Sequence, residues 1–239
     1  MGYSKNHRFL KSKKIYPSPN NAHKIMNKYK IVSLVLGIAL LATMTRLVAI
    51  HRDATNNEPN SVNSTAHAVM SNILSRKSVR SYTNEAVTRS QLDTLVRVAM
   101  AAPTGRDMRP WKFIVIDDKA MMQKLANALP YAKMLTEAQA AIVVCGDLSI
   151  TEKEGKPSTN WTFDCSAATE NLLLQAEAMG LGAVWTGVYP YEDRTAAVQS
   201  VISLPQNIVP FCLVPIGHPK GEPQPKDKYN KENIHYNGW

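Results

Sequence analysis

The sequence predicts a mixed α+β domain over residues 64–239, behind a basic N-terminal leader. Helical and extended apolar patterns alternate along this region. The chain has 239 residues, 44% of them hydrophobic, which is enough for one domain with its own core. Glycine fingerprints of dinucleotide or nucleotide triphosphate sites are missing from the sequence. Gly180-Leu181-Gly182 is only a fragment of one and follows a helical pattern rather than a strand.

The expected elements follow one another in chain order. The first helix is Ser64–Ser75, and the second is predicted by apolar residues at helical spacing, namely Leu92, Leu95, Val96, Ala99 and Met100. Ser90 and Asp93 are predicted to cap this second helix, and Pro103 to stop it. Further helices are expected at Lys119–Leu129, Phe163–Met179 and Asp193–Ser203, and strands at Trp111–Ile116, Ala140–Cys145, Ala183–Gly187 and Phe211–Ile216. The helix at Phe163–Met179 has little polar face, which predicts burial in the core or at a subunit interface.

The net charge of +9 is concentrated at the N-terminus. Residues 1–52 contain ten Lys or Arg and no Asp or Glu, which leaves 18 basic and 19 acidic residues in the rest of the chain. The globular part therefore has a formal charge of −1, so no nucleic-acid-binding surface is indicated.

An uncharged apolar run follows the basic residues, from Ile31 to Thr45. Its length fits the apolar core of a signal peptide, and Leu47-Val48-Ala49-Ile50 extends it past Arg46 toward the length of a membrane anchor. Residues 1–50 are therefore predicted to be a basic leader with a signal peptide or anchor, and Met26 offers a second possible start. The basic flank places the N-terminus in the cytoplasm, so residues 31–50 predict membrane contact and a domain on the non-cytoplasmic side. Residues 51–63 have no apolar period and are predicted to be a linker.

A basic segment, Arg76-Lys77-Ser78-Val79-Arg80, is the most informative local feature. Guanidinium groups, an ammonium group and a hydroxyl together suit a phosphate or another compact anion. A charge run at a helix end is more often a solvated surface, so further segments decide its meaning. These are residues 102–111, with the sequence Ala-Pro-Thr-Gly-Arg-Asp-Met-Arg-Pro-Trp, and Gly217-His218-Pro219 followed by Lys226-Asp227-Lys228.

In this order and at these separations the three segments resemble the FMN-dependent nitroreductase family, over residues 67–239. The resemblance implies the nitroreductase-like fold, a mostly antiparallel central sheet flanked by helices, in a homodimer whose FMN sites are each built from both subunits. It assigns Arg76, Lys77, Ser78 and Arg80 to the phosphate, ribityl and pyrimidine contacts of FMN. Lys226 and Lys228 match the basic pair that closes on the phosphate, and Arg80 would lie near N1 and O2 of the flavin.

The second segment matches the family at Pro103, Thr104 and Gly105 but departs from it at two further positions. Asp107 and Arg109 stand where the family commonly has Asn and Gln. An Asp cannot donate a hydrogen bond as Asn does, so an ion pair between Asp107 and Arg109 beside the cofactor is one expectation.

A fourth cofactor-binding stretch is implied at Trp185, Thr186 and Gly187. By resemblance its backbone approaches the flavin ring, and the N–H of Gly187 would point at N5. Glycine permits such a close approach, although a strand end explains Gly187 equally well.

No catalytic triad, carboxylate pair or metal-ligand spacing is visible, and Cys145, Cys165 and Cys212 are predicted to be buried small hydrophobes. The resemblance implies a ping-pong cycle in which NAD(P)H reduces FMN and an electron-poor nitroaromatic or quinone then takes the electrons. Two alternatives stay open: a membrane-tethered flavin-binding dimer without turnover, and a relative with other flavin chemistry, such as dehalogenation or flavin fragmentation.

Overall fold

The structure, a computed structural model, describes residues 19–56, 58–151 and 155–239. It divides into two compact units, the first ending at Thr65 and the second formed by Ala66–Trp239.

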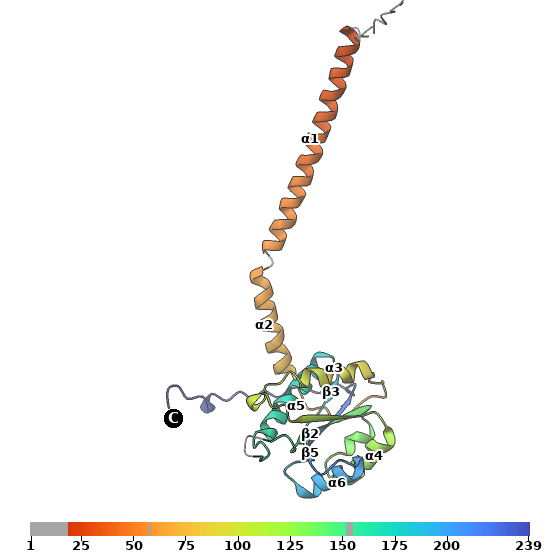
Figure 1. Cartoon of the computed structure of the whole chain (residues 1–239), viewed down its shortest axis with the longest axis vertical. Coiled ribbons are helices and arrows are strands. Elements are labelled where there is room, and N and C mark those ends of the chain that lie inside the picture. Colours follow the sequence, from red (N-terminus) through yellow and green to blue (C-terminus); the bar gives the residue numbers. More distant parts are fainter. Residues whose placement is uncertain (1–18, 57, 152–154) are drawn as a thin grey trace, which may run out of the picture. The chain divides into compact units, whose positions relative to one another are not determined.

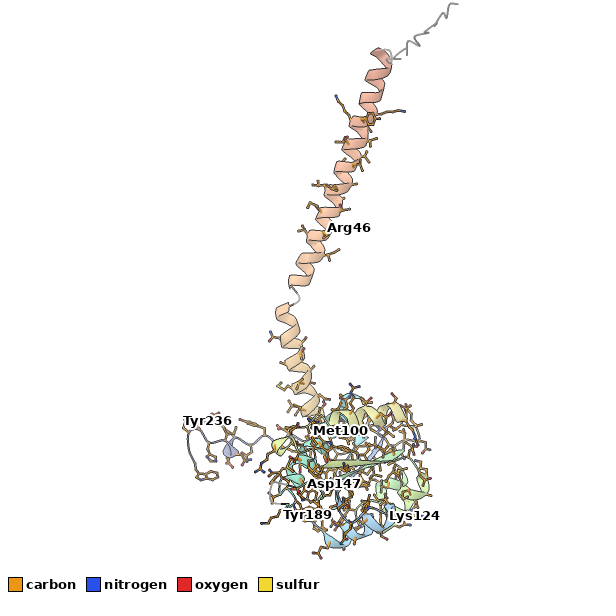
Figure 2. The ribbon with its side chains drawn as sticks, viewed as in Figure 1. Arg46, Met100, Lys124, Asp147, Tyr189 and Tyr236 are labelled. Atoms are coloured by element: carbon orange, nitrogen blue, oxygen red, sulfur yellow. The ribbon has the colours of Figure 1, made fainter. Side chains whose placement is uncertain are left out.

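The first unit is dominated by helix α1, Pro19–Asn56. Its segment Lys28–Ile50 has 23 residues with a mean hydropathy of 2.2 and no buried residue, and Arg46 lies near its end (Figure 2). Among the described residues it is the one helix long and apolar enough to cross a membrane, and a signal sequence has the same properties. The basic residues predicted as the start of the leader, 1–18, lie outside the described residues.

The linker predicted over residues 51–63 is helical on both sides of residue 57. Helix α1 runs to Asn56, and α2 covers Glu58–Ser75. Pro59 is compatible with this because the N–H groups of a helix's first turn have no partner within the helix. The role of this stretch as a connection stays a prediction.

The second unit is a five-stranded sheet between two pairs of helices (Figure 1). Its strands are β1 Trp111–Ile116, β2 Ala140–Asp147, β3 Gly182–Ala183, β4 Thr186–Gly187 and β5 Ile208–Gly217. Its helices after α2 are α3 Arg89–Ala99, α4 Lys119–Ala128, α5 Trp161–Ala178 and α6 Glu192–Ile202, with short 3-10 turns at Gly105–Asp107, Lys133–Thr136 and Lys231–Asn233. The strand order is β1-β2-β5-β3 with β4 also on β5, and all these pairs are antiparallel. The predicted α+β class and antiparallel sheet are confirmed.

Side chains alternate between the two faces of the sheet, which gives two apolar layers. Ile142 and Val144 of β2 pack in the layer that contains α3 and α5. Ala141 and Val143 pack in the layer that contains α4 and α6. Figure 1 shows these helix pairs on opposite sides of the sheet. The three cysteines are free and buried in these layers, as predicted.

The strand predicted at Ala183–Gly187 is interrupted. Ala183 pairs with Ile216 and Thr186 with Leu213, so the register is continuous and places Val184 opposite Pro215. Proline has no N–H to donate, so the ladder loses its bond there and two short strands result.

The cap of α3 also differs from the prediction. Thr88, rather than Ser90, is the N-cap, and its side chain accepts the N–H of Gln91 while the Gln91 side chain accepts the N–H of Thr88. This capping box lies two residues before the predicted one. Within one chain, helix α5 is buried along one side, and Phe163 on it is 71% exposed, so burial at a subunit interface stays a prediction for the rest of the helix.

Candidate cofactor site

The basic segment 76–80 is held against the sheet by its apolar neighbours. Val79 is buried, and its N–H donates to the carbonyl of Ala183 at 3.0 Å. Tyr82 is also buried, and its hydroxyl donates to the Val79 carbonyl at 2.7 Å. A Cβ added to Gly182 would stand 2.6 Å from Cγ1 of Val79, so the close approach of this segment to β3 depends on glycine.

The chain that follows β5 runs back along the basic segment. The N–H of Lys220 donates to the carbonyl of Ser81 at 3.0 Å, and the N–H of Thr83 donates to the carbonyl of His218 at 2.9 Å. Tyr82 and Pro219 form an antiparallel bridge between them. This pairing carries residues 224–228 to the side of residues 76–80, although the two segments lie 148 positions apart in the sequence (224 minus 76).

A pocket of about 270 Å³ lies where the two segments meet. It is lined by five cations, a hydroxyl and an amide, from the residues Arg76, Lys77, Ser78, Arg80, Gln224, Lys226 and Lys228. No carboxylate is among these lining residues. The first and the last of the sequence-predicted segments therefore form one cationic pocket.

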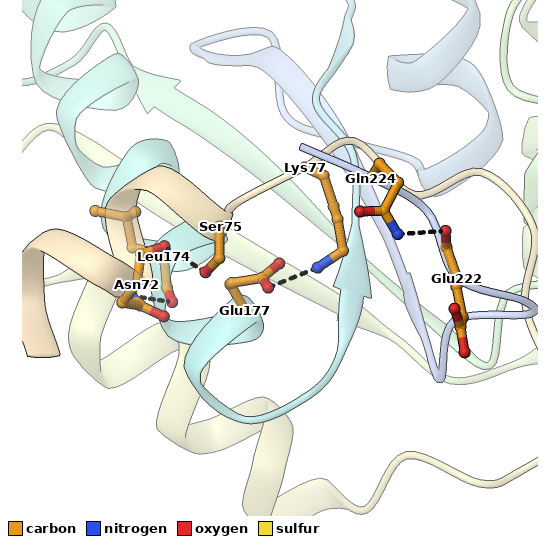
Figure 3. A network of polar contacts seen from close by, with 7 residues as sticks. All are labelled: Asn72, Ser75, Lys77, Leu174, Glu177, Glu222 and Gln224. Carbon is orange, nitrogen blue, oxygen red and sulfur yellow. Dashed lines mark hydrogen bonds and ion pairs between the residues drawn. The ribbon is translucent and has the colours of Figure 1, made fainter. Parts of the chain in front are cut away.

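Two of the five cations already have carboxylate partners on α5. Lys77 Nζ lies 2.7 Å from Glu177 Oε1, and Figure 3 shows the lysine reaching across to this helix. Arg76 Nε lies 3.4 Å from Glu170 Oε1. The two glutamates lie outside the pocket lining and reduce the mutual repulsion of its cations. Gln224, which also lines the pocket, donates from its side-chain amide to the carbonyl of Glu222 at 3.1 Å (Figure 3).

The loop at residues 103–109 has an unusual backbone. Arg106, Asp107 and Arg109 all have φ between 51° and 56°, a left-handed backbone conformation that residues other than glycine rarely adopt. The N–H of Arg109 donates to Thr104 Oγ1 at 3.2 Å. Pro103 is exposed, and Thr104 and Gly105 are half-buried.

The expected ion pair between Asp107 and Arg109 is present. Arg109 Nε donates to Asp107 Oδ1 at 2.7 Å, and Nη2 to Oδ2 at 2.5 Å. These bonds lower the pKa of the Asp107 carboxyl and raise the pKa of the Arg109 guanidinium. Both side chains are largely exposed, so a ligand bound at this loop would meet both charges of the ion pair.

The stretch Trp185–Gly187 is fixed by β5 and by aromatic contacts. Thr186 is buried, and Trp185 packs edge-on against Phe211 with ring centroids 5.4 Å apart. A Cβ on Gly187 would meet no atom within 4 Å, so the space beside this glycine is open. Arg194 donates from Nη1 to the Gly187 carbonyl at 3.2 Å.

In the described part of one chain, the cationic pocket does not extend to the other two predicted regions. Within the described ranges, neither residues 103–109 nor residues 185–187 line the cationic pocket. Residues 76–80 and the 185–187 stretch do share a sheet edge, through the parallel bridge between Ser78 and Ala183.

The comparison with known families decides the identity of this arrangement. The model of the nitroreductase family matches residues 73–140 and 126–218. The chain belongs to the nitroreductase family. A relative from Methanothermobacter thermautotrophicus, named "Putative NADH dehydrogenase/NAD(P)H nitroreductase", is 39% identical over 171 residues, which are 72% of this chain and 87% of that protein.

Solved structures of nitroreductase-type proteins share the fold. A protein of the same name from Bacteroides thetaiotaomicron is 50% identical, with a TM-score of 0.68 over 72% of this chain and 98% of that one. A nitroreductase from Desulfovibrio desulfuricans, solved in complex with FMN, is 27% identical, with a TM-score of 0.62 over 72% and 97% of the two chains. The nitroreductase-like fold predicted from the sequence is therefore confirmed.

Sequence reasoning missed the residues that form ion pairs and hydrogen bonds with the predicted site residues. Glu170, Glu177 and Arg194 contact predicted site residues but belong to helices read only for their apolar pattern. Asp164 was missed for the same reason, and its Oδ1 accepts the N–H of Gly105 at 2.9 Å.

Proposed function

We propose that this nitroreductase-family chain is an FMN-dependent oxidoreductase that passes electrons from NAD(P)H to a small electron-poor acceptor, of the nitroaromatic or quinone type, in a ping-pong cycle. The observation that carries the proposal is the cationic pocket, which joins the two segments that the family resemblance assigns to the FMN phosphate. Relatives named as NAD(P)H nitroreductases and a solved structure with FMN support it.

The chemistry of the pocket fits a phosphate monoester. Such a group carries nearly two negative charges near pH 7 and needs several cations or donors to leave water. Arg76 and the two lysines of the C-terminal pair supply cations, and Ser78 adds a hydroxyl donor. Glu170 and Glu177 leave the pocket with a positive excess, since they pair with only two of its five cations.

Bound FMN would supply the hydride chemistry, and the protein would supply binding, orientation and charge. Arg80 would place a cation at the pyrimidine end of the flavin and so favour its reduced, anionic form. Trp185, Thr186 and Gly187 would bring backbone against the ring, where the open space beside Gly187 leaves room for it. Pro103, Thr104, Gly105, Asp107 and Arg109 would contact the flavin ring or its ribityl chain in the same site.

A homodimer accounts for the separation of these parts. Residues 103–109 do not line the cationic pocket of their own chain. In a site built from two chains, these residues would come from the partner subunit. Apolar side chains are also exposed in quantity on the domain, with Leu74 of α2 65% exposed and Tyr229 74% exposed. Tyr236 lies further along the extended C-terminal arm, residues 224–239 (Figure 2). Large exposed apolar surfaces of this kind commonly mark interfaces.

The full chain, purified in detergent, tests the enzyme proposal directly. We expect yellow protein with one FMN per chain, a dimeric mass by light scattering, and bleaching of the flavin by NADPH or NADH in the absence of oxygen. A nitroaromatic or quinone should then restore the colour. Protein that stays colourless with excess FMN would refute the proposal, and flavin that neither nucleotide bleaches would favour the binding protein without turnover.

We also propose that α1 directs the chain to the membrane, with the domain on the non-cytoplasmic side. Lys28–Ile50 rises about 1.5 Å per residue, which is enough to cross a hydrocarbon core of about 30 Å. Fractionation with N-terminal sequencing distinguishes a retained anchor from a cleaved signal. A soluble cytoplasmic chain with an intact N-terminus would contradict the location without touching the flavin proposal.

A further inference from the structure

Asp164 is a buried carboxylate that accepts a hydrogen bond from the 103–109 loop rather than from its own helix. It lies in the first turn of α5 and is only 5% exposed. A first-turn acid usually stabilises the free N–H groups of its helix, but Oδ1 of Asp164 accepts the N–H of Gly105, 59 positions earlier in the chain. The other oxygen, Oδ2, is buried and has no hydrogen-bond partner within the described part of the chain.

An unpartnered buried carboxylate oxygen is unfavourable, because it has left water without a compensating donor. The carboxylate offsets part of this cost with its bond to the Gly105 N–H. A buried polar group that carries such a cost calls for an explanation, and this bond points to a role in holding the loop rather than in the apolar core.

The loop that Asp164 holds is itself strained. Its three left-handed residues, Arg106, Asp107 and Arg109, follow directly after the Gly105 contact. Strained conformations persist only where the surroundings over-determine them, and they cluster at functional sites. Asn160, just before α5, contributes a second restraint, since a Cβ on Gly105 would lie 2.8 Å from its Nδ2.

We propose that Asp164 is a positioning residue for electron transfer: it fixes Gly105 and thereby holds the Asp107–Arg109 ion pair in place beside the bound flavin. This inference rests on the proposed function, because it takes the 103–109 loop to face the flavin. Asp164 itself is buried, and its Oδ1 accepts the backbone N–H of the loop at Gly105. Its effect is exerted through the geometry of the loop, where small displacements are enough to slow a reaction.

The test uses the full chain in detergent with three variants. Asp164→Ala removes the acceptor, Asp164→Asn keeps it, and Gly105→Ala pushes the loop away from Asn160 by a different route. We expect FMN to remain bound in Asp164→Ala and Gly105→Ala, because the cationic pocket that would hold its phosphate is untouched. We expect flavin bleaching by NADPH to slow by about 10- to 100-fold, the range for a misplaced site. Hydrogen exchange in residues 104–109 should accelerate in both, and Asp164→Asn should recover most of the native rate and protection.

Asp118→Ala is the matched control. Its carboxylate also holds a single backbone N–H, that of Met121 at 2.7 Å, but at the start of α4. It should keep the native rate of bleaching. The inference fails if Asp164→Ala bleaches at the native rate, if Asp164→Asn is as slow as Asp164→Ala, or if Asp118→Ala is equally slow. If Asp164→Ala does not fold, native bleaching by Gly105→Ala overturns the inference instead. A native chain that binds no flavin would refute the proposed function itself, which separates the two failures.

Discussion

Replacing Arg76 by Ala should weaken FMN binding without unfolding the domain. Arg76 lines the cationic pocket with a side chain that is 17% exposed, so its bond to a phosphate would be largely shielded from water. A hydrogen bond to a charged group contributes about 1.5–3 kcal/mol. At about 1.4 kcal/mol per tenfold change, this raises the dissociation constant of FMN by roughly 10- to 150-fold.

The stability of the domain should change little in the same variant. Glu170, which loses its partner at 3.4 Å, is 50% exposed and remains hydrated. Ion pairs of this exposure contribute little to folding.

A comparison of FMN with riboflavin isolates the phosphate in this experiment. Both ligands are titrated into the flavin-free full chain, and binding is followed by the quenching of flavin fluorescence. Because riboflavin has no phosphate, Arg76→Ala should leave its affinity unchanged.

Arg89→Ala serves as the control for the loss of one cation. Arg89 forms an ion pair with Asp117 at 2.9 Å and does not line the pocket. Equal weakening of FMN by Arg89→Ala, or equal weakening of riboflavin by Arg76→Ala, would refute the assignment of the pocket to the phosphate.

Three further predictions test the site and the core. Arg80→Ala should retain FMN but lower its reduction potential and slow its reduction by NAD(P)H, because a nearby cation favours the reduced anion; an unchanged potential would contradict this role. Gly182→Ala would put a Cβ 2.6 Å from Val79 Cγ1 and displace the basic segment, so FMN titration should show weaker binding. Burial raises the pKa of the Cys145 and Cys212 thiols to about 12. Unfolded thiols titrate near 8.5, so the unfolded chain releases protons that the folded chain keeps, and the free energy of unfolding should fall as pH rises above about 8.5. Denaturant titrations at increasing pH measure this fall, which Cys145→Ala should reduce.

The fold was predictable where local pattern and tertiary environment agree. The strand Trp111–Ile116 is found at its predicted bounds, and β2 starts where expected at Ala140. The edge of the sheet was not predictable. The break at Val184 arises from Pro215 on the facing strand, and the register that brings these two residues together is not visible in the local sequence. The Thr88–Gln91 capping box, in contrast, was visible in the sequence and was passed over for Ser90.

The site was predictable in its ligand-facing residues and not in its support. Cations and glycines stand out in a sequence because their chemistry is unusual, and chain order linked Arg76 to Lys226 and Lys228. Glu177 looks like any surface acid of a helix, and only the fold brings it to Lys77, 100 positions away. Its role is set by packing, which a single sequence does not display.

Helix α5 carries at its two ends the supports of two different regions. Asp164 near its start holds the 103–109 loop, and Glu177 near its end holds the basic segment. Thirteen residues of helix at about 1.5 Å each keep these two supports roughly 20 Å apart along its axis. The helix thus acts as a spacer of fixed length, and a loop rearrangement that leaves α5 intact does not shorten it. A cofactor that touches both regions would therefore most simply contact the basic segment of one chain and the 103–109 loop of a second chain.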